Sequence, residues 1–278
     1  MELQYPARKK IHKNQVLKKG IGFLKVIYVR IVYNLNAFLQ KRSARFKTTC
    51  FNFGLVLPEN ETLVLKAEDE KDRIYFQMYQ YACRTLSLKE KAILEIGSSV
   101  GGGCYFISEY LQPKYLKGID LIESQINLAK KRHQQHPIVF EQGNACNLKE
   151  PENFYDVVVN IESSHGYPDF SAFLKGVYKT LKKEGTMAIA DIRYAYDVPK
   201  MEEDFISHGF SIQHQEDITK WVLKALDESD KTKREILKDT PLFYTFFKSF
   251  AGLKGSRNYR YLAEGKLRYM LYILQKNG

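Results

Sequence analysis

The fold is decided by the stretch Ala92-Ile93-Leu94-Glu95-Ile96-Gly97-Ser98-Ser99-Val100-Gly101-Gly102-Gly103. Residues 92–96 form a short apolar run interrupted only by Glu95, which is typical of a buried parallel strand. Glycines follow at once, and a helix is predicted over residues 104–111. Because glycine adopts positive φ and carries no Cβ, its backbone N–H groups can come close to a ligand. The stretch therefore predicts a strand, a glycine turn and a helix that could hold a nucleotide.

A second strand, predicted over residues 115–120, ends in an acidic side chain at the spacing found in nucleotide sites. Its last residue, Asp120, falls about 20 residues after the glycines, where a carboxylate can accept hydrogen bonds from both ribose hydroxyls. A glycine turn alone also occurs as a plain connection between a strand and a helix. The acid at this spacing favours a Rossmann-type nucleotide site.

Two enzyme classes use such a site. Dinucleotide oxidoreductases need the turn G-x-G-x-x-G for a pyrophosphate, whereas this chain has Glu95-Ile96-Gly97-Ser98-Ser99-Val100-Gly101. The pattern E-x-G-x-(G/S)-x-G resembles the first motif of class I S-adenosylmethionine-dependent methyltransferases, with Ser99 where that family usually has glycine. The resemblance implies S-adenosyl-L-methionine as cofactor. We expect its binding residues to be Glu95, Gly97, Ser98, Gly101, Asp120, Leu121, Asn144, Ala145, Asn160 and Glu162.

The rest of the chain alternates as a doubly wound fold should. Helices are expected over residues 64–86, 123–133, 170–182, 200–208 and 219–226, and strands over 138–142, 155–161, 186–190, 210–213 and 267–275. The predicted fold is an α/β, Rossmann-like doubly wound sheet, mostly parallel with an antiparallel C-terminal strand, plus an N-terminal helical arm.

The net charge of +11 is concentrated at the N-terminus. Residues 1–50 carry 12 Lys and Arg and one acid, Glu2, whereas the other 228 residues carry 31 basic and 31 acidic side chains. We therefore divide the chain into a basic arm, 1–50, and a catalytic domain, 51–278. The neutral domain gives no sign of nucleic-acid binding. Four widely spaced cysteines, Cys50, Cys83, Cys104 and Cys146, argue against a disulfide framework or zinc site and favour a reducing cytoplasm.

Within the arm, residues 20–39 repeat apolar side chains at helical spacing. Lys25, Arg30 and Asn34 interrupt the run, so a membrane-spanning helix is not expected. Two interpretations remain open: a lid over the catalytic domain, or a basic amphipathic helix that lies on the inner face of a membrane through residues 8–47.

Ligands of doubly wound sheets bind at the carboxyl ends of the strands. The residues expected there include Asn144, Asn160, Glu162 and Asp191. The amide oxygen of Asn144 could accept a hydrogen bond from the adenine amino group, or the residue could simply suit a turn.

His165 follows the strand 155–161, and Asp191 ends the next strand. If these strands are neighbours, the two side chains meet beside the reactive end of the cofactor. A carboxylate raises the basicity of an imidazole and sets its tautomer, as a general base for a hydroxyl requires. His165 and Asp191 are therefore the expected catalytic pair.

Longer segments resemble one family. Residues 162–168 (Glu-Ser-Ser-His-Gly-Tyr-Pro), 190–193, 217–227, 250–256 and 51–54 are similar to the phthiotriol and phenolphthiotriol dimycocerosate methyltransferases. The resemblance covers about residues 50–278 and implies O-methylation of a hydroxyl on a lipid, polyketide or glycosylated natural product. Sugar O-methyltransferases with a similar E-S-x-H segment use a histidine and an aspartate as a catalytic pair, which match His165 and Asp191. Some such enzymes hold Mg²⁺, for which Glu162 and Asp191 would be candidates, although no metal-ligand cluster is evident.

The acceptor pocket is expected to use aromatic side chains, namely Trp221, Tyr244 and Phe247, which suit a bulky apolar small molecule or lipid. Alternatives are N- or C-methylation of a small molecule, an inactive cofactor-binding subunit, or a peripheral membrane module driven by the arm. The oligomeric state stays open.

Overall fold

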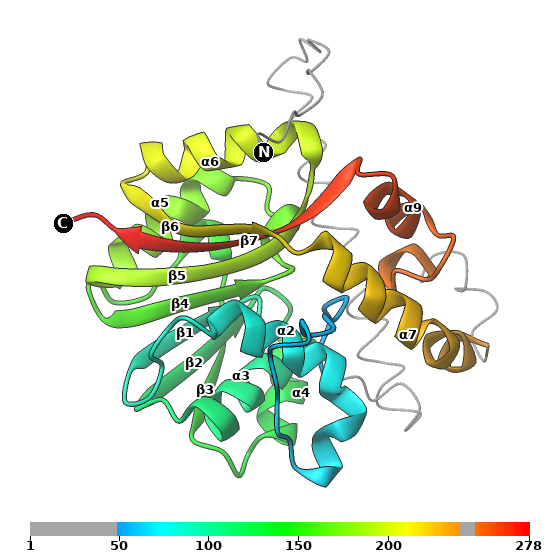
Figure 1. The fold of residues 1–278 in the computed structure, drawn as a ribbon. Coiled ribbons are helices and arrows are strands. Elements are labelled where there is room, and N and C mark those ends of the chain that lie inside the picture. The colour runs from blue at the N-terminus through cyan, green and yellow to red at the C-terminus, as the bar shows by residue number, and fades with distance from the viewer. Residues whose placement is uncertain (1–48, 239–247) are drawn as a thin grey trace.

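The computed structural model describes residues 49–238 and 248–278. The predicted arm helix, Tyr244 and Phe247 lie outside these residues. The described chain forms a seven-stranded sheet in the order β3-β2-β1-β4-β5-β7-β6 (Figure 1). The strands are β1 (Ala92–Ile96), β2 (Tyr115–Asp120), β3 (Ile138–Gln142), β4 (Tyr155–Ile161), β5 (Leu181–Tyr194), β6 (Phe210–Asp217) and β7 (Leu267–Lys276).

Strand directions confirm the predicted mixed sheet. β1, β2, β3, β4 and β5 pair in parallel, whereas β7 runs antiparallel to both β5 and β6. β7 is inserted between two strands that precede it in the chain, so the last strand completes the sheet from within rather than at its edge. The strand order reverses between β1 and β4, and this reversal is where a doubly wound fold binds its ligand.

Helices cover both faces of the sheet (Figure 1). α2 (Arg73–Cys83), α3 (Gly102–Phe106), α4 (Glu123–Arg132), α7 (Thr219–Leu237) and α9 (Arg257–Ala263) share one apolar core with the sheet. α5 (Phe170–Thr180) and α6 (Val198–Ser207) share the second core. The central strands are apolar on both sides because each face is covered. In β1, for example, Ile93 belongs to one core and Leu94 to the other.

Several element boundaries differ from the sequence-based expectations. The stretch 64–86 holds a 3₁₀-helix (Ala67–Asp72) before α2, and the stretch after the glycines is α3 followed by a π-helical turn (Ile107–Leu111). β5 and β6 extend beyond the predicted 186–190 and 210–213, and residues 191–194 of β5 and 214–217 of β6 pair with β7. α7 continues past residue 226 through a mostly charged stretch to Leu237, whose side chain is buried.

Candidate functional site

The turn after β1 is built by backbone geometry that favours glycine. Gly97 has φ +83° and Gly101 has φ +85°, both in the left-handed region. A Cβ on Gly97 would lie 2.1 Å from Ser163 Oγ. Ser99, where the family motif usually has glycine, also has positive φ (+48°), which explains why glycine suits the position. The turn thus presents bare backbone at the carboxyl end of β1.

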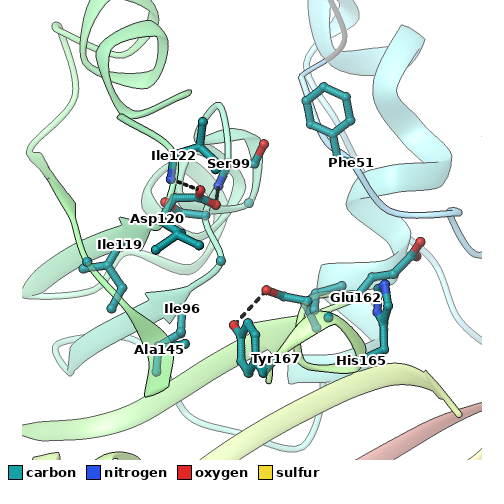
Figure 2. Close-up of a pocket in the computed structure, with 18 of the residues that line it drawn as sticks. Phe51, Ile96, Ser99, Ile119, Asp120, Ile122, Ala145, Glu162, His165 and Tyr167 are labelled. Carbon is teal, nitrogen blue, oxygen red and sulfur yellow. Dashed lines mark hydrogen bonds between the residues drawn. The ribbon is translucent and has the colours of Figure 1, made fainter. Parts of the chain in front are cut away.

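Asp120 is held against this turn. Its Oδ2 accepts a hydrogen bond from Ser99 N (3.0 Å), and its Oδ1 accepts one from Ile122 N (2.9 Å), as Figure 2 shows. Burial raises the pKa of Asp120 to about 6, although these backbone donors oppose the shift. A carboxylate oxygen has more than one acceptor position, so both oxygens can still receive ribose hydroxyls.

A cavity of about 290 Å³ opens at the carboxyl ends of β1, β2 and β4. Most expected cofactor residues line it: Gly97, Ser98, Asp120, Leu121, Asn144, Ala145 and Glu162. Asn144 forms a turn, which was one of the two roles expected for it: its Oδ1 accepts a hydrogen bond from Cys146 N at 2.9 Å. This contact leaves a second acceptor position on the oxygen.

The other three expected cofactor residues, Glu95, Gly101 and Asn160, are not among the residues that line the cavity. Glu95 is buried, and its Oε1 accepts a hydrogen bond from Tyr79 Oη at 2.7 Å; burial raises the pKa of Glu95 to about 7. Gly101 is the N-cap of α3. Asn160 Nδ2 donates to Ile96 O (2.8 Å) and to Tyr167 Oη (3.0 Å), so Asn160 joins the ends of β1 and β4.

Several buried polar atoms around the cavity have no hydrogen-bond partner among the described residues, some of them at expected cofactor residues. Asn160 Oδ1 and Ser98 Oγ are two of these atoms. Orphaned buried polar atoms are rare in folded proteins unless a ligand or water satisfies them. Together with the bare glycine turn and Asp120, they fit a polar nucleoside-type cofactor.

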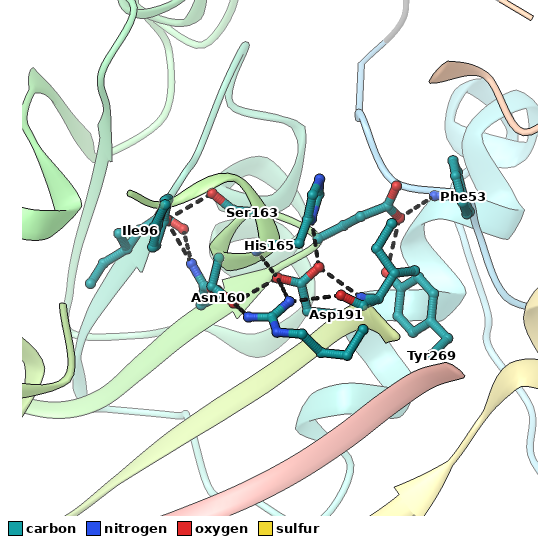
Figure 3. A network of polar contacts seen from close by, with 12 residues as sticks. Phe53, Ile96, Asn160, Ser163, His165, Asp191 and Tyr269 are labelled. Carbon is teal, nitrogen blue, oxygen red and sulfur yellow. Dashed lines mark hydrogen bonds and ion pairs between the residues drawn. The ribbon is translucent and has the colours of Figure 1, made fainter. Parts of the chain in front are cut away.

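His165 and Asp191 meet as predicted. Nδ1 of His165 lies 2.7 Å from Oδ1 of Asp191, and His165 N donates to Asp191 Oδ2 at 2.8 Å (Figure 3). Asp191 is buried, whereas 41% of the His165 side chain is exposed, toward the cavity that it lines. Withdrawal from bulk water opposes the charged imidazole, but the charge and hydrogen bond of Asp191 outweigh it, so the pKa of His165 lies above its usual value.

Arg193 and Ser164 complete the surroundings of Asp191. Ser164 Oγ donates to Asp191 Oδ2 (2.6 Å), Arg193 Nη2 donates to Ser164 Oγ (2.6 Å), and Arg193 Nη1 forms an ion pair with Asp191 at 3.1 Å. Burial disfavours the Asp191 carboxylate, yet the cationic neighbours and hydrogen bonds keep its pKa below the usual range. Its oxygens already accept from four neighbours, Ile192 N included, and no group of three or more potential metal ligands lies within residues 49–238 and 248–278.

Several aromatic and small side chains that were not expected at the site also line the cavity. Thr49, Cys50, Phe51, Tyr79, Tyr167 and Phe250 line it. Phe51 and Phe250 lie with ring centroids 6.3 Å apart. The expected pocket residue Trp221 is not among the lining residues; it packs on α7 against the first core, with Lys220 Nζ 4.3 Å from its ring centroid. Phe51, Tyr167 and Phe250 lie in segments that resemble the methyltransferase family, 51–54, 162–168 and 250–256, but the sequence did not assign them to the cavity.

Comparison with known proteins shows the family to which this chain belongs. A model described as "Methyltransferase domain" matches residues 87–260. The chain is 34% identical to a phthiotriol/phenolphthiotriol dimycocerosates methyltransferase from Mycobacterium leprae, over 77% of this chain and 80% of that one. The chain belongs to the S-adenosylmethionine-dependent methyltransferases. This methyltransferase is also 28% identical to a fatty-acid O-methyltransferase from Mycolicibacterium smegmatis, over 81% of this chain and 82% of that one.

A solved structure supports the fold assignment. Geranyl diphosphate C-methyltransferase from Streptomyces coelicolor, crystallised with Mg²⁺, geranyl diphosphate and S-adenosyl-L-homocysteine, aligns with a TM-score of 0.59 and 13% identity. The alignment covers 81% of the methyltransferase and 91% of that chain. The fold is that of a Rossmann-like methyltransferase, and the cofactor is S-adenosylmethionine. No helix within the described residues is long and apolar enough to cross a membrane.

Proposed function

We propose that this methyltransferase transfers a methyl group to a hydroxyl of a lipid, polyketide or glycosylated natural product, with His165 as general base. The observation that carries the proposal is the ion pair between His165 Nδ1 and Asp191 Oδ1, beside a cavity that His165 lines. Relatives named as methyltransferases of phthiotriols and as a fatty-acid O-methyltransferase support an apolar lipid acceptor.

The cofactor would be held from one side of the cavity. Asp120 would bind the ribose, Asn144 and Ala145 would lie by the adenine, and the turn from Gly97 would leave room for the methionine portion. Bound S-adenosylmethionine supplies a methyl group on a positively charged sulfur, which is already activated for transfer. The protein's task is then alignment and exclusion of water, for which the apolar walls at Phe51 and Phe250 are suited.

His165 would remove the proton from the acceptor. Its Nδ1 is engaged by Asp191, which leaves Nε2 free to take the hydroxyl proton while the oxygen bonds to the methyl carbon and the carbon–sulfur bond breaks. The products are a methyl ether, S-adenosylhomocysteine and an imidazolium that Asp191 stabilises. Arg193 and Ser164 keep Asp191 ionised and oriented during this proton transfer.

Domain organisation and location belong to the same proposal. Residues 51–278 would be the catalytic domain, and the basic arm, 1–50, would contact the anionic inner face of a membrane through residues 8–47, from the cytoplasm. A lipid acceptor partly dissolved in that membrane would be accessible to an enzyme that binds its surface.

The proposal is tested by incubating the enzyme with lipid and polar extracts and S-adenosylmethionine labelled in its methyl group. We expect mass spectrometry to find the label as a new methyl ether. The His165→Ala variant should lose about 100-fold or more in kcat, with cofactor affinity nearly unchanged in a calorimetric titration. Label on nitrogen or carbon, or equal loss of turnover and cofactor affinity in the variant, would contradict O-methylation with a histidine base.

A further inference from the structure

Glu162 is a carboxylate of the cavity that the proposed proton transfer does not use. It directly follows β4, with φ +48°, a left-handed conformation that is strained for a residue with a Cβ. Its N–H donates to Ala190 O at 2.7 Å, so the strained backbone is tied to β5. The side chain lines the cavity beside His165, and Figure 2 shows the two side chains next to each other.

Two donors immobilise one oxygen of this carboxylate. Oε2 accepts hydrogen bonds from Phe53 N (2.7 Å) and from Tyr269 Oη (2.9 Å), which approach it together in Figure 3. Tyr269 is fully buried on β7, so the position of its hydroxyl is set by the core. The other oxygen, Oε1, receives no hydrogen bond from residues 49–238 or 248–278, and no Lys, Arg or His among them forms an ion pair with Glu162.

Oε1 faces a cavity whose walls are partly apolar. Phe51 and Phe250 contribute apolar surface to the same cavity, and burial raises the pKa of Glu162 to about 7 despite its two donors. When an acceptor displaces water from the cavity, this oxygen needs a hydrogen-bond donor from the acceptor itself. A monoalcohol bound to His165 has used its only hydroxyl proton, so a second polar group is needed.

Building on the proposed O-methylation, we propose that Glu162 Oε1 accepts a hydrogen bond from a second hydroxyl of the acceptor, which is therefore a diol or polyol. One hydroxyl faces His165 and becomes methylated, while its neighbour on Glu162 sets which hydroxyl that is. Glu162 then acts as a specificity determinant at the acceptor end of the cavity, opposite the ribose position at Asp120.

The test compares three probes of equal chain length: an alkyl vicinal diol, the matching monoalcohol and the matching fatty acid. Above the pKa of Glu162, at about pH 8, we expect the wild-type enzyme to methylate the diol with at least about tenfold higher kcat/KM than the monoalcohol, since a hydrogen bond to a charged group is among the stronger ones. In the Glu162→Gln variant this ratio should fall several-fold. The amide oxygen takes the place of Oε2 against its two donors, so only an uncharged –NH₂, which makes a weaker hydrogen bond with the second hydroxyl, is left at the Oε1 position.

A matched control is Glu203→Gln on α6, whose side chain is exposed, and which should leave the ratio unchanged. Cofactor affinity, measured by calorimetry, distinguishes a role of Glu162 in binding the cofactor from its role in binding the acceptor. A Glu162→Gln variant that loses cofactor affinity while keeping the diol ratio would overturn the inference, as would a wild-type preference for the fatty acid or no preference between the alcohols. Failure of the wild type to methylate any alcohol would instead refute O-methylation itself.

A second variant, Tyr269→Phe, tests the same carboxylate without changing Glu162. Tyr269→Phe removes one donor to Oε2 without changing the size of the buried ring. We expect it to reduce the diol preference less than Glu162→Gln does, because Phe53 N still holds the carboxylate. A larger loss of preference in Tyr269→Phe than in Glu162→Gln would show that Glu162 itself does not contact the acceptor.

Discussion

Nδ1 of His165 lies 2.7 Å from Oδ1 of Asp191. His165 lies in the short helical turn after β4, and Asp191 lies near the carboxyl end of the adjacent parallel strand β5. Asp191 also accepts the backbone N–H of His165 at 2.8 Å. The carboxylate therefore sets both the ring and the backbone that carries it, which leaves the far nitrogen of the imidazole directed away from the pair. This arrangement makes the state of His165 depend on the charges around Asp191.

The pH profile of the enzyme should report that dependence. A general base works as the neutral imidazole, so kcat/KM falls as the pH drops below the pKa of His165. Because Asp191 raises this pKa, the midpoint of the acid limb should lie above 6.5. In Asp191→Asn the midpoint should move to lower pH, with at least about tenfold lower turnover because the ring orientation is lost. An acid limb that does not move on this substitution would remove Asp191 from the mechanism.

Arg193→Met should move the limb in the opposite direction. The Arg193 guanidinium lowers the pKa of His165 and pairs with Asp191 at 3.1 Å, so its removal strengthens the effect of Asp191 on the imidazole. We expect a higher midpoint and a lower melting temperature, since a buried ion pair loses one partner. The measurement is kcat/KM against pH under conditions where circular dichroism shows the variant folded. A shift to lower pH would contradict the assignment.

Cofactor affinity should depend on the ionisation of Asp120. Burial raises its pKa to about 6, and only the carboxylate offers both oxygens as acceptors. The affinity for S-adenosylmethionine should therefore weaken as the pH falls from 7 to 5, roughly tenfold per unit below the pKa at most. Asp120→Asn should weaken binding about tenfold at neutral pH and flatten the pH dependence. Calorimetric titration measures both, and a wild-type affinity constant over this range would count against the ribose role.

Two glycines offer a matched pair in the same cavity. Gly97→Ala places a Cβ 2.1 Å from Ser163 Oγ at φ +83°, so we expect weaker cofactor binding and a free energy of unfolding lower by about 2 kcal/mol or more. Gly166→Ala meets nothing within 4 Å and has no positive φ, and should change stability by less than about 1 kcal/mol. Equal melting temperatures for the two variants would show that the turn can accommodate a Cβ at Gly97, against the expectation from its geometry.

Much of the site could be predicted because its elements are local. The apolar run before Gly97, the acid at Asp120 and the histidine after β4 each lie where a strand ends, and parallel strands bring their carboxyl ends to one edge of the sheet. Trp221 shows the limit of that reasoning. Its aromatic ring suggested a pocket, but α7 packs it, half-buried, against the core, and composition does not distinguish these outcomes.

The sequence by itself determined the alternation of strands and helices and the bare turn at Gly97, because periodicity and spacing along the chain report local conformation directly. For His165 and Asp191 it predicted positions after successive strands, and their contact depended on the pairing of β4 with β5 that the structure shows. Only the tertiary structure decided what surrounds Glu162. Its partners Phe53 and Tyr269 are 109 and 107 positions away, and Tyr269 reaches it because β7 pairs between β5 and β6. A pattern along the chain shows which face of a strand is buried, but the partner on that face follows from how distant segments pack together.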